Sequence, residues 1–380
     1  MNAGSNRRMA RMATLVAATA GACAAIGSGA ALAQVGGGGL GTPSPPLVKD
    51  VTCSVRCLDL RTVTETGKIE ITGTGLGSVS TVRFKGDEGR LDVKPASAAD
   101  TVVTATVPEG ASDGKVSVLN MAGQKSTSPS AIEVAPKDSI EAVDGFSVKH
   151  AEATPTKTFF DSAKRSELEY LFAADGPTDV RVNVINKKTG ETVDSVVQED
   201  QEPFANHSFK WNGLDADKSV ARNGDYKFQV SQLSGGPGAG AGFDYYDHIF
   251  PLRGKHYYGD GLGAGRGHQG QDVFAKCGTK IVAARGGRVQ VNAYQSAAGY
   301  YLVIDGQKTG QDYVYMHMEQ RGRPAAGTRV HTGDVIGYES DTGDAQGCHL
   351  HFELWSAPGW YEGGHVLDPT TPLKKWDRYS

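Results

Sequence analysis

The chain has 380 residues, with 39 Lys and Arg against 43 Asp and Glu, and a formal net charge of −4. A chain of this length fits two or three domains rather than one. The slightly acidic balance excludes the basic surface of a nucleic-acid-binding protein, so we expect no nucleic-acid partner.

Residues 1–33 have the pattern of a secretory signal peptide. Three arginines lie within the first eleven residues, and an apolar stretch rich in Ala and Gly follows and ends in Ala-Leu-Ala at residue 33, a typical cleavage site. Glycines interrupt this stretch, which is short of the about 20 strongly apolar residues of a membrane span. We therefore expect cleavage, no stable membrane insertion and a secreted or cell-envelope location, in the periplasm or cell wall. The export route, general or twin-arginine, stays open.

Loss of that segment would change the formal net charge to −7 and leave four cysteines. An even number of cysteines in an exported protein predicts two disulfides. Cys53 and Cys57 form a local pair, and Cys277 with Cys348 would join two distant segments. No second cysteine pair with zinc-finger spacing exists in the sequence, so metal binding by Cys53 and Cys57 is disfavoured.

Two β-sandwiches are expected in the first two thirds of the chain. Residues 34–48 are rich in Gly and Pro and predict a flexible linker. Residues 49–136 contain short β-branched runs between turn residues, which predicts a small antiparallel sandwich. The turn at 73–77 and the run at 82–84 resemble the immunoglobulin-like TIG (IPT) modules. That turn lacks the Lys-Ser/Thr and the helix of a phosphate loop.

In residues 146–233 apolar and polar side chains alternate, as they do in half-buried strands, and this pattern predicts a second sandwich. The segment 209–215 resembles the immunoglobulin-like fold of flagellar hook-capping proteins. We expect Trp211 in its core rather than against a ligand. Residues 234–243 are rich in Gly and predict a flexible linker. Because His150 and His207 stand alone, neither sandwich offers a catalytic cluster, and a wall polymer or protein partner for these domains is left open.

The remaining residues, 244–380, form the predicted catalytic domain and hold eight of the ten histidines. Residues two apart on a strand point to the same face, so His349 and His351 project side by side. His268 and Asp272 add an imidazole and a carboxylate four residues apart. Zinc accepts such nitrogen and oxygen ligands, and a hydrolytic zinc needs three of them plus an open position for water.

The His-x-x-x-Asp pair, a Tyr-x-Tyr-x-His strand and the His-Leu-His strand follow in an order that closely resembles the lysostaphin/LytM-type zinc endopeptidases, which cut peptidoglycan peptides. The resemblance covers about the last 130 residues. It implies an all-β chain in which two immunoglobulin-like sandwiches precede an antiparallel catalytic domain of the LytM/duplicated hybrid motif type. It also implies Zn²⁺ ligands at His268, Asp272 and His351, with His349 as general base and His317 orienting water or stabilising the oxyanion; which of these two takes the proton stays open.

Cys348 stands where relatives often have Pro, and a bond to Cys277 would fasten the His351 strand against the Asp272 strand. For Glu353 we expect a hydrogen bond to a ligating histidine or a surface salt bridge rather than metal binding. Core or rim packing is favoured over a role in lining a groove for Trp355, Trp360, Tyr361 and Trp376. Packing or surface positions are expected for His248, His256, His331 and His365.

These observations predict a secreted zinc metalloendopeptidase that hydrolyses peptide bonds in the stem peptides or cross-links of bacterial peptidoglycan. The substrate class rests on the resemblance, because the same fold and metal would serve another peptide. The alternative is a catalytically silent wall-binding or amidase-activating scaffold. All five site residues are retained, which favours the enzyme.

Overall fold

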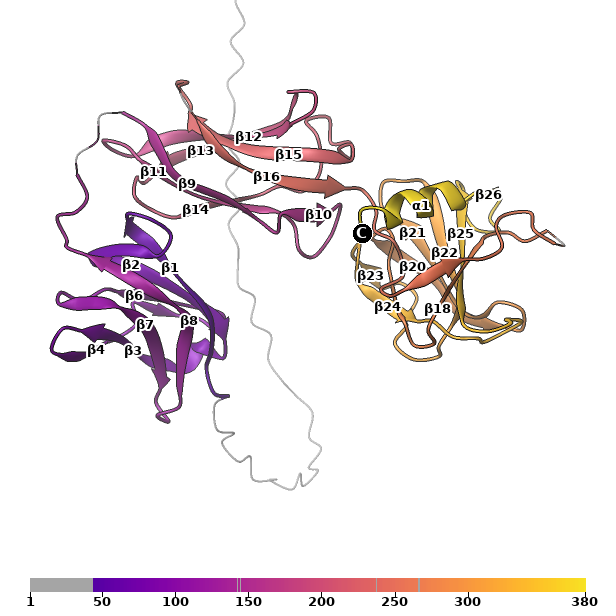
Figure 1. The fold of residues 1–380 in the computed structure, drawn as a ribbon, viewed down its shortest axis with the longest axis horizontal. Helices are drawn as coiled ribbons and strands as arrows, with labels where there is room; N and C mark the ends of the chain where they lie inside the picture. Colours follow the sequence, from indigo (N-terminus) through magenta and orange to yellow (C-terminus); the bar gives the residue numbers. More distant parts are fainter. Residues whose placement is uncertain (1–43, 142, 144, 237, 266) are drawn as a thin grey trace, which may run out of the picture. The chain divides into compact units, whose positions relative to one another are not determined.

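The computed structural model describes residues 44–380 except 142, 144, 237 and 266 (Figure 1). The expected signal peptide and most of the expected 34–48 linker therefore lie outside the described residues. Strands dominate the described part, which has one α-helix, α1 (Thr370–Asp377). No helix in this part of the chain has the length and apolar character needed to cross a membrane. The all-β prediction is confirmed.

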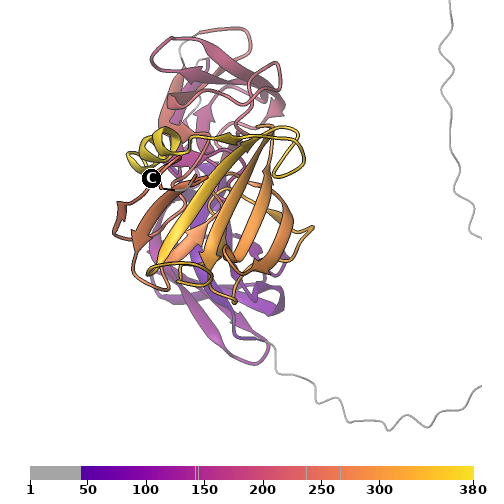
Figure 2. The ribbon, with the colours of Figure 1, turned by 90° about the vertical axis from the view of Figure 1, so that its right-hand side faces the viewer.

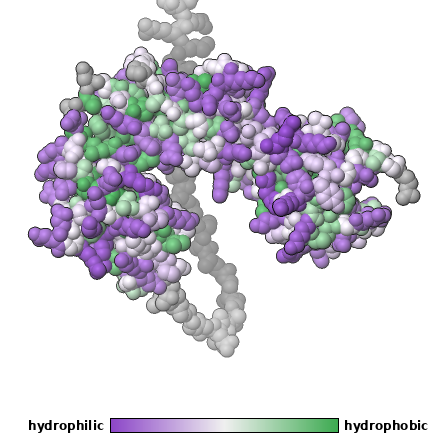
Figure 3. All heavy atoms as spheres, viewed as in Figure 1, coloured by the Kyte–Doolittle hydropathy of each residue, from purple (hydrophilic) through white to green (hydrophobic). Residues whose placement is uncertain are grey.

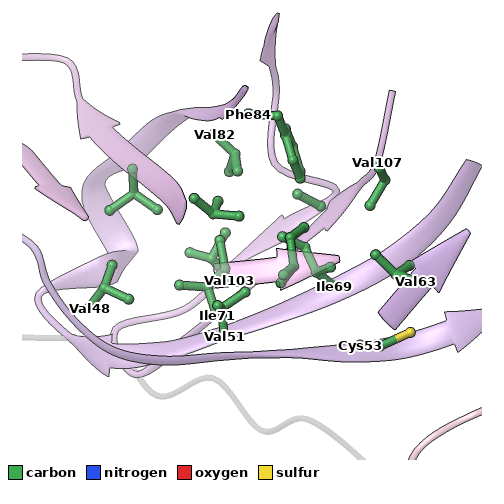
Figure 4. Packing of buried hydrophobic residues seen from close by; sticks show 14 of the residues in the cluster. Val48, Val51, Cys53, Val63, Ile69, Ile71, Val82, Phe84, Val103 and Val107 are labelled. Carbon is green, nitrogen blue, oxygen red and sulfur yellow. The ribbon is translucent and has the colours of Figure 1, made fainter. Parts of the chain in front are cut away.

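The first sandwich is built around a core of β-branched residues. Its strands form the path β4-β3-β7-β8-β2-β6-β5, with β1 on β2, and all the pairs are antiparallel except β2 with β8. Ile71 pairs with Val51 on one side and Val103 on the other, and all three side chains are fully buried (Figure 4). The strands are β1 (Leu47–Cys57), β2 (Thr62–Thr74), β3 (Val79–Gly86), β4 (Gly89–Val93), β5 (Ser97–Ala98), β6 (Val102–Thr106), β7 (Ala111–Asn120) and β8 (Lys125–Ala135).

The second sandwich packs a five-stranded sheet, β10-β16-β15-β12-β13, and a three-stranded sheet, β14-β11-β9, around one core. Trp211 is buried in that core, and its indole N–H donates to the Leu214 carbonyl, so the core position expected for it is confirmed. The strands are β9 (Ser147–Thr154), β10 (Lys157–Phe159), β11 (Glu167–Ala173), β12 (Thr178–Asn186), β13 (Thr192–Gln201), β14 (His207–Lys210), β15 (Gly224–Gln232) and β16 (Ala239–Tyr246).

The glycine-rich stretch at 234–243 corrects one prediction. Residues from Ala239 onward belong to β16, which pairs antiparallel with β15, so the prediction of a flexible linker is wrong for residues 239–243. A Cβ at Gly240 would lie 1.8 Å from the Phe228 carbonyl oxygen. Glycine therefore permits a close backbone approach inside a strand, a use that composition does not distinguish from flexibility.

The C-terminal domain has an eight-stranded sheet in the order β17-β18-β25-β22-β21-β20-β23, with β26 on β25, and a separate β19-β24 pair. Figure 2 shows its long strands side by side with α1 at one end. On the C-terminal domain, purple and white atoms predominate on the face visible in Figure 3, since the apolar side chains of this domain lie in its core. The strands are β17 (His256–Tyr258), β18 (Gln271–Ala275), β19 (Lys280–Val282), β20 (Gly287–Gln295), β21 (Gly299–Gly306), β22 (Gln311–Met318), β23 (Arg329–Val330), β24 (Val335–Tyr338), β25 (His349–Ser356) and β26 (Val366–Leu367).

Strand β25 separates the core from a polar face by simple alternation. Leu350, Phe352 and Leu354 belong to the hydrophobic core. His349 and His351, which alternate with these apolar residues, therefore point to the opposite face of the sheet. Because β25 pairs with β18 on one side and β22 on the other, this face receives side chains from three segments that are far apart in sequence.

Candidate metal and hydrolytic site

A groove of about 670 Å³ lies over the polar face of these three strands. The register aligns Asp272 of β18 and Met316 of β22 with His351 of β25. His268 comes from the loop before β18. All five residues proposed from the sequence line this groove, together with Phe274, Tyr301, Trp360 and Tyr361, which the sequence did not assign to it.

Three side chains converge as a possible metal site. Oδ1 of Asp272 lies 3.0 Å from Nε2 of His268 and 2.9 Å from Nδ1 of His351. One ligand atom from each residue fits within 4.8 Å of the others. Nδ1 of His268 is 2.9 Å from the Gly261 carbonyl, so it carries the proton and leaves Nε2 as the ligand atom. Two imidazole nitrogens and one carboxylate oxygen fit a three-ligand zinc site with an open position.

The electrostatics of the cluster suit a cation. Burial raises the pKa of Asp272, but the hydrogen bond from His351 and the electrostatic effects of the three neighbouring histidines together outweigh burial and hold the pKa below its ordinary value. Burial lowers the pKa of His351, whereas Asp272 and Glu353 raise it, with a net rise to about 9. The carboxylate is therefore ionised, and a divalent ion would take the place of a proton held between the same groups.

His349 is buried beside this cluster with one nitrogen facing it. Nδ1 of His349 lies 2.9 Å from the Gly347 carbonyl, and Nε2 lies 3.6 Å from Oδ1 of Asp272. The ring stacks on Phe274, with centroids 4.9 Å apart. Nδ1–H donates a hydrogen bond to this carbonyl, so Nε2 carries the lone pair and faces the groove, as a proton acceptor requires.

His317 reaches the same groove through a β-bulge. Met316 and His317 together oppose Tyr301 of β21, and His317 has a φ of 58°. A bulge re-aims a side chain, and here it turns His317 away from the core face that holds Tyr315. Nδ1 of His317 lies 2.8 Å from the Thr342 carbonyl. Burial lowers the pKa of His317 to about 4, so the ring is neutral near pH 7 and its Nε2 accepts rather than donates.

The remaining predicted side chains divide between the groove and the packed interior. Trp355 and Trp376 are buried as expected, but Trp360 and Tyr361 line the groove, so the interpretation that was less favoured holds for these two. Tyr361 donates from its hydroxyl to Oε1 of Gln269. The sequence offered a signal for Phe274, which is two residues past Asp272 on the same strand face. The histidines expected to pack or lie at the surface line no part of this groove, namely His248, His256, His331 and His365.

Both expected disulfides are present. Cys53 is bonded to Cys57, and Cys277 is bonded to Cys348, with Cα atoms 5.3 Å apart in the second pair. Cys277 lies just after β18, and Cys348 just before β25. The second bond therefore ties together the ends of the two strands that carry Asp272 and His351.

We expect the double substitution Cys277→Ser/Cys348→Ser to destabilise the C-terminal domain by about 2–5 kcal/mol and to weaken zinc binding, because the two ligand strands lose their tie. Calorimetry with and without zinc measures both effects. Cys53→Ser/Cys57→Ser is the matched control, since that bond lies in the first sandwich. An unchanged zinc content together with an unchanged thermal midpoint would show that the bond has no such role.

Two family descriptions match the chain: Peptidase family M23 at residues 266–369 and the FlgD Ig-like domain at residues 156–236. An uncharacterized metalloprotease of Haemophilus influenzae is 33% identical over 109 residues, which cover 28% of this chain and 21% of that protein. The peptidoglycan DD-endopeptidase ShyC of Vibrio cholerae is 37% identical over 91 residues, which cover 23% of this chain and 20% of that protein. The chain thus spans about a fifth of the length of these relatives.

Among solved structures, the catalytic domain of the antimicrobial peptidase lysostaphin from Staphylococcus simulans is similar at 25% identity and a TM-score of 0.29, covering 31% of this chain and 92% of that one. The resemblance of residues 49–136 to TIG modules stays a prediction. The resemblances drawn from the C-terminal histidine motifs and from residues 209–215 are confirmed by the two family matches. Residues 266–369 of this chain therefore match peptidase family M23, and residues 156–236, which precede them, match the FlgD Ig-like domain.

Proposed function

We propose that this protein is a zinc-dependent endopeptidase of the cell envelope that hydrolyses peptide bonds in the stem peptides or cross-links of peptidoglycan. The observation that carries the proposal is the convergence of His268, Asp272 and His351 in one groove with the free Nε2 atoms of His349 and His317. The relative named as a peptidoglycan DD-endopeptidase supports the substrate class. The proposal that the protein is exported is supported by the signal-like sequence of residues 1–33 and by the two disulfides.

In this proposal His268, Asp272 and His351 hold the metal. Zinc, when bound, supplies Lewis-acid chemistry for peptide hydrolysis. His349 takes a proton from the attacking water at Nε2 and returns it to the leaving amine. Neutral His317 accepts a hydrogen bond from water at Nε2, so its geometry favours orienting water over stabilising the oxyanion, which needs a donor.

The domain organisation also belongs to the proposal. Residues 247–380 would form the catalytic unit, three residues fewer than the predicted 244–380, because β16 of the second sandwich continues to Tyr246. Two sandwiches, at 49–136 and from 146 to the end of β16 at Tyr246, would place it on a wall polymer or a protein partner. The alternative of a catalytically silent wall-binding or amidase-activating scaffold keeps the fold but makes no use of the two acceptor nitrogens beside the metal cluster.

The test uses the full chain, its zinc content, and mass spectrometry of the products from purified peptidoglycan and defined cross-linked muropeptides. We expect new peptide termini from the wild type, loss of cleavage after chelation and recovery with zinc. Asp272→Asn should lose zinc and cleavage together, because it removes the charged ligand. His365→Ala is the matched control, since His365 is exposed and lies outside the groove. Bound zinc without cleavage of several wall types would favour the scaffold instead.

A further inference from the structure

Glu353 is a buried carboxylate next to the candidate metal cluster. It lies on β25, on the same face as His349 and His351, and its side chain is only 3% exposed. Its Oε1 is 3.1 Å from Nε2 of His351, and its Oε2 accepts the indole N–H of Trp355 at 2.7 Å. A buried carboxylate is costly unless it is hydrogen-bonded, and here each oxygen has a donor.

His351 is held between two carboxylates, one on each ring nitrogen. Nδ1 faces Asp272 and Nε2 faces Glu353. A neutral imidazole has one N–H, and an ionised carboxylate accepts but does not donate. A proton kept at Nε2 by Glu353 therefore leaves the Nδ1 lone pair for a metal ion.

The two ligand histidines require opposite tautomers. His268 presents Nε2 and donates a hydrogen bond from Nδ1–H to a backbone carbonyl. His351 presents Nδ1, and its remaining proton meets a carboxylate rather than a carbonyl. A carboxylate partner makes the ligand nitrogen more basic and fixes the ring orientation. The two ligand histidines are therefore held differently: His351 has a carboxylate as its hydrogen-bond partner, which is the stronger acceptor, and His268 has a backbone carbonyl.

From this geometry we propose that Glu353 is a positioning residue for metal binding: held in place by Trp355, it keeps His351 in the tautomer that offers Nδ1 to zinc. The role rests on the zinc site of the proposed function. Trp355 is suited to this support because it is buried against Val303 and Val314. The indole N–H, the one polar hydrogen of the Trp355 side chain, donates to Glu353.

Trp355 also contacts an aromatic residue that lines the groove, Tyr361. The Trp355 ring lies 4.9 Å from the Tyr361 ring. Tyr361 in turn donates to Gln269, the residue after His268. Trp355 thus connects through Glu353 to one ligand histidine and through Tyr361 to the loop that carries the other.

The test is Glu353→Gln in the full chain, with zinc affinity measured by competition against a chromophoric chelator. The amide has nearly the same shape but lacks the charge that holds the Nε2 proton, so we expect zinc to bind about 10- to 100-fold more weakly. Long-range ¹H–¹⁵N spectra of the zinc form should show the His351 proton on Nε2 in the wild type and a loss of that preference in the variant. Trp355→Phe removes only the indole N–H and should weaken zinc binding less.

Trp376→Phe is the matched control, because Trp376 is as buried as Trp355 but lies in the core of the domain. It should alter the thermal midpoint and leave zinc affinity unchanged. The proposal is overturned if Glu353→Gln binds zinc as the wild type does, or if it lowers only the stability of the metal-free protein. If Glu353→Gln does not fold, unchanged zinc affinity in Trp355→Phe overturns it.

The result also separates this role from the proposed function. A wild type that binds no zinc contradicts both. Weakened zinc binding in Glu353→Gln, with no cleavage of peptidoglycan by the wild type, upholds the positioning role and contradicts the peptidase activity.

Discussion

Replacing His349 by alanine is expected to lower kcat/KM for peptide hydrolysis by about 10²- to 10⁴-fold, while the zinc content stays at the wild-type level. The nitrogen that would take the proton is Nε2 of His349, and the substitution leaves the three proposed metal ligands in place. Cleavage of a defined muropeptide, followed together with metal analysis, measures both quantities.

His317→Ala separates the two acceptor histidines. Because burial keeps the pKa of His317 at about 4, the ring stays neutral above about pH 5 and should not set the acid limb of the pH–rate profile. We expect His317→Ala to lower kcat/KM less than His349→Ala and to leave the acid limb in place. An equal or larger loss in His317→Ala, with a shifted acid limb, would reverse the two roles.

Glu339→Gln is expected to stabilise the C-terminal domain above pH 7 by up to about 3 kcal/mol. Glu339 is 0% exposed, and its Oε1 accepts the backbone N–H of Ala275 at 2.7 Å. Among the described residues, its other carboxylate oxygen has no hydrogen-bond partner. Burial raises the pKa of Glu339 from 4.5 to about 7, against the smaller opposing effects of Ala275 and His256.

The sign follows from proton binding. Between about pH 4.5 and 7 the folded domain holds a proton on Glu339 that the unfolded chain has lost, so its stability falls as the pH rises. His317 has the opposite effect: its pKa is lowered to about 4, and stability falls as the pH drops below 6.5. The two effects overlap, so the difference between Glu339→Gln and wild type isolates Glu339.

Calorimetry of the zinc-loaded full chain at pH 5 and pH 8 measures the difference in stability between Glu339→Gln and wild type. The unfolding transition of the C-terminal domain is recognised because zinc shifts its midpoint. The gain should be present at pH 8 and small at pH 5. Glu362→Gln, at an exposed position, is the control and should show no pH-dependent difference. A variant that is equally or less stable than the wild type at pH 8 would mean that Glu339 carries no such penalty.

Much of the site follows from sequence because strand alternation is a local rule. His349 and His351 share a face wherever the strand lies, and the apolar residues that alternate with them identify the core side. The same rule applies to Asp272 and Phe274, which lie two residues apart on β18, although Phe274 was not assigned to the groove from the sequence. The family resemblance then supplied the set of ligands, and the expected Cys277–Cys348 bond placed the two strands against each other, which alternation does not specify.

Other features depend on contacts that no local pattern encodes. Alternation through Tyr313 and Tyr315 would leave His317 on the core face, and only the bulge opposite Tyr301 moves it to the groove. The glycines of β16 were misinterpreted for a related reason. These glycines allow the backbone of β16 to lie close to a neighbouring strand, whereas the composition of the segment is typical of a linker. For Glu353 the sequence predicts either a hydrogen bond to a ligating histidine or a surface salt bridge. The side chain is buried against His351, so it makes the bond to the histidine.

The central place of β25 has a consequence for when activity can begin. Asp272 and His351 are 79 residues apart in sequence, and β25 is the last of the three site strands along the chain, although it lies between the other two. Non-local pairings of this kind form late, because the entropy of closing a long loop must be overcome first. We expect partly folded chains to lack the hydrolytic centre, so the fold itself delays activity until the domain is complete.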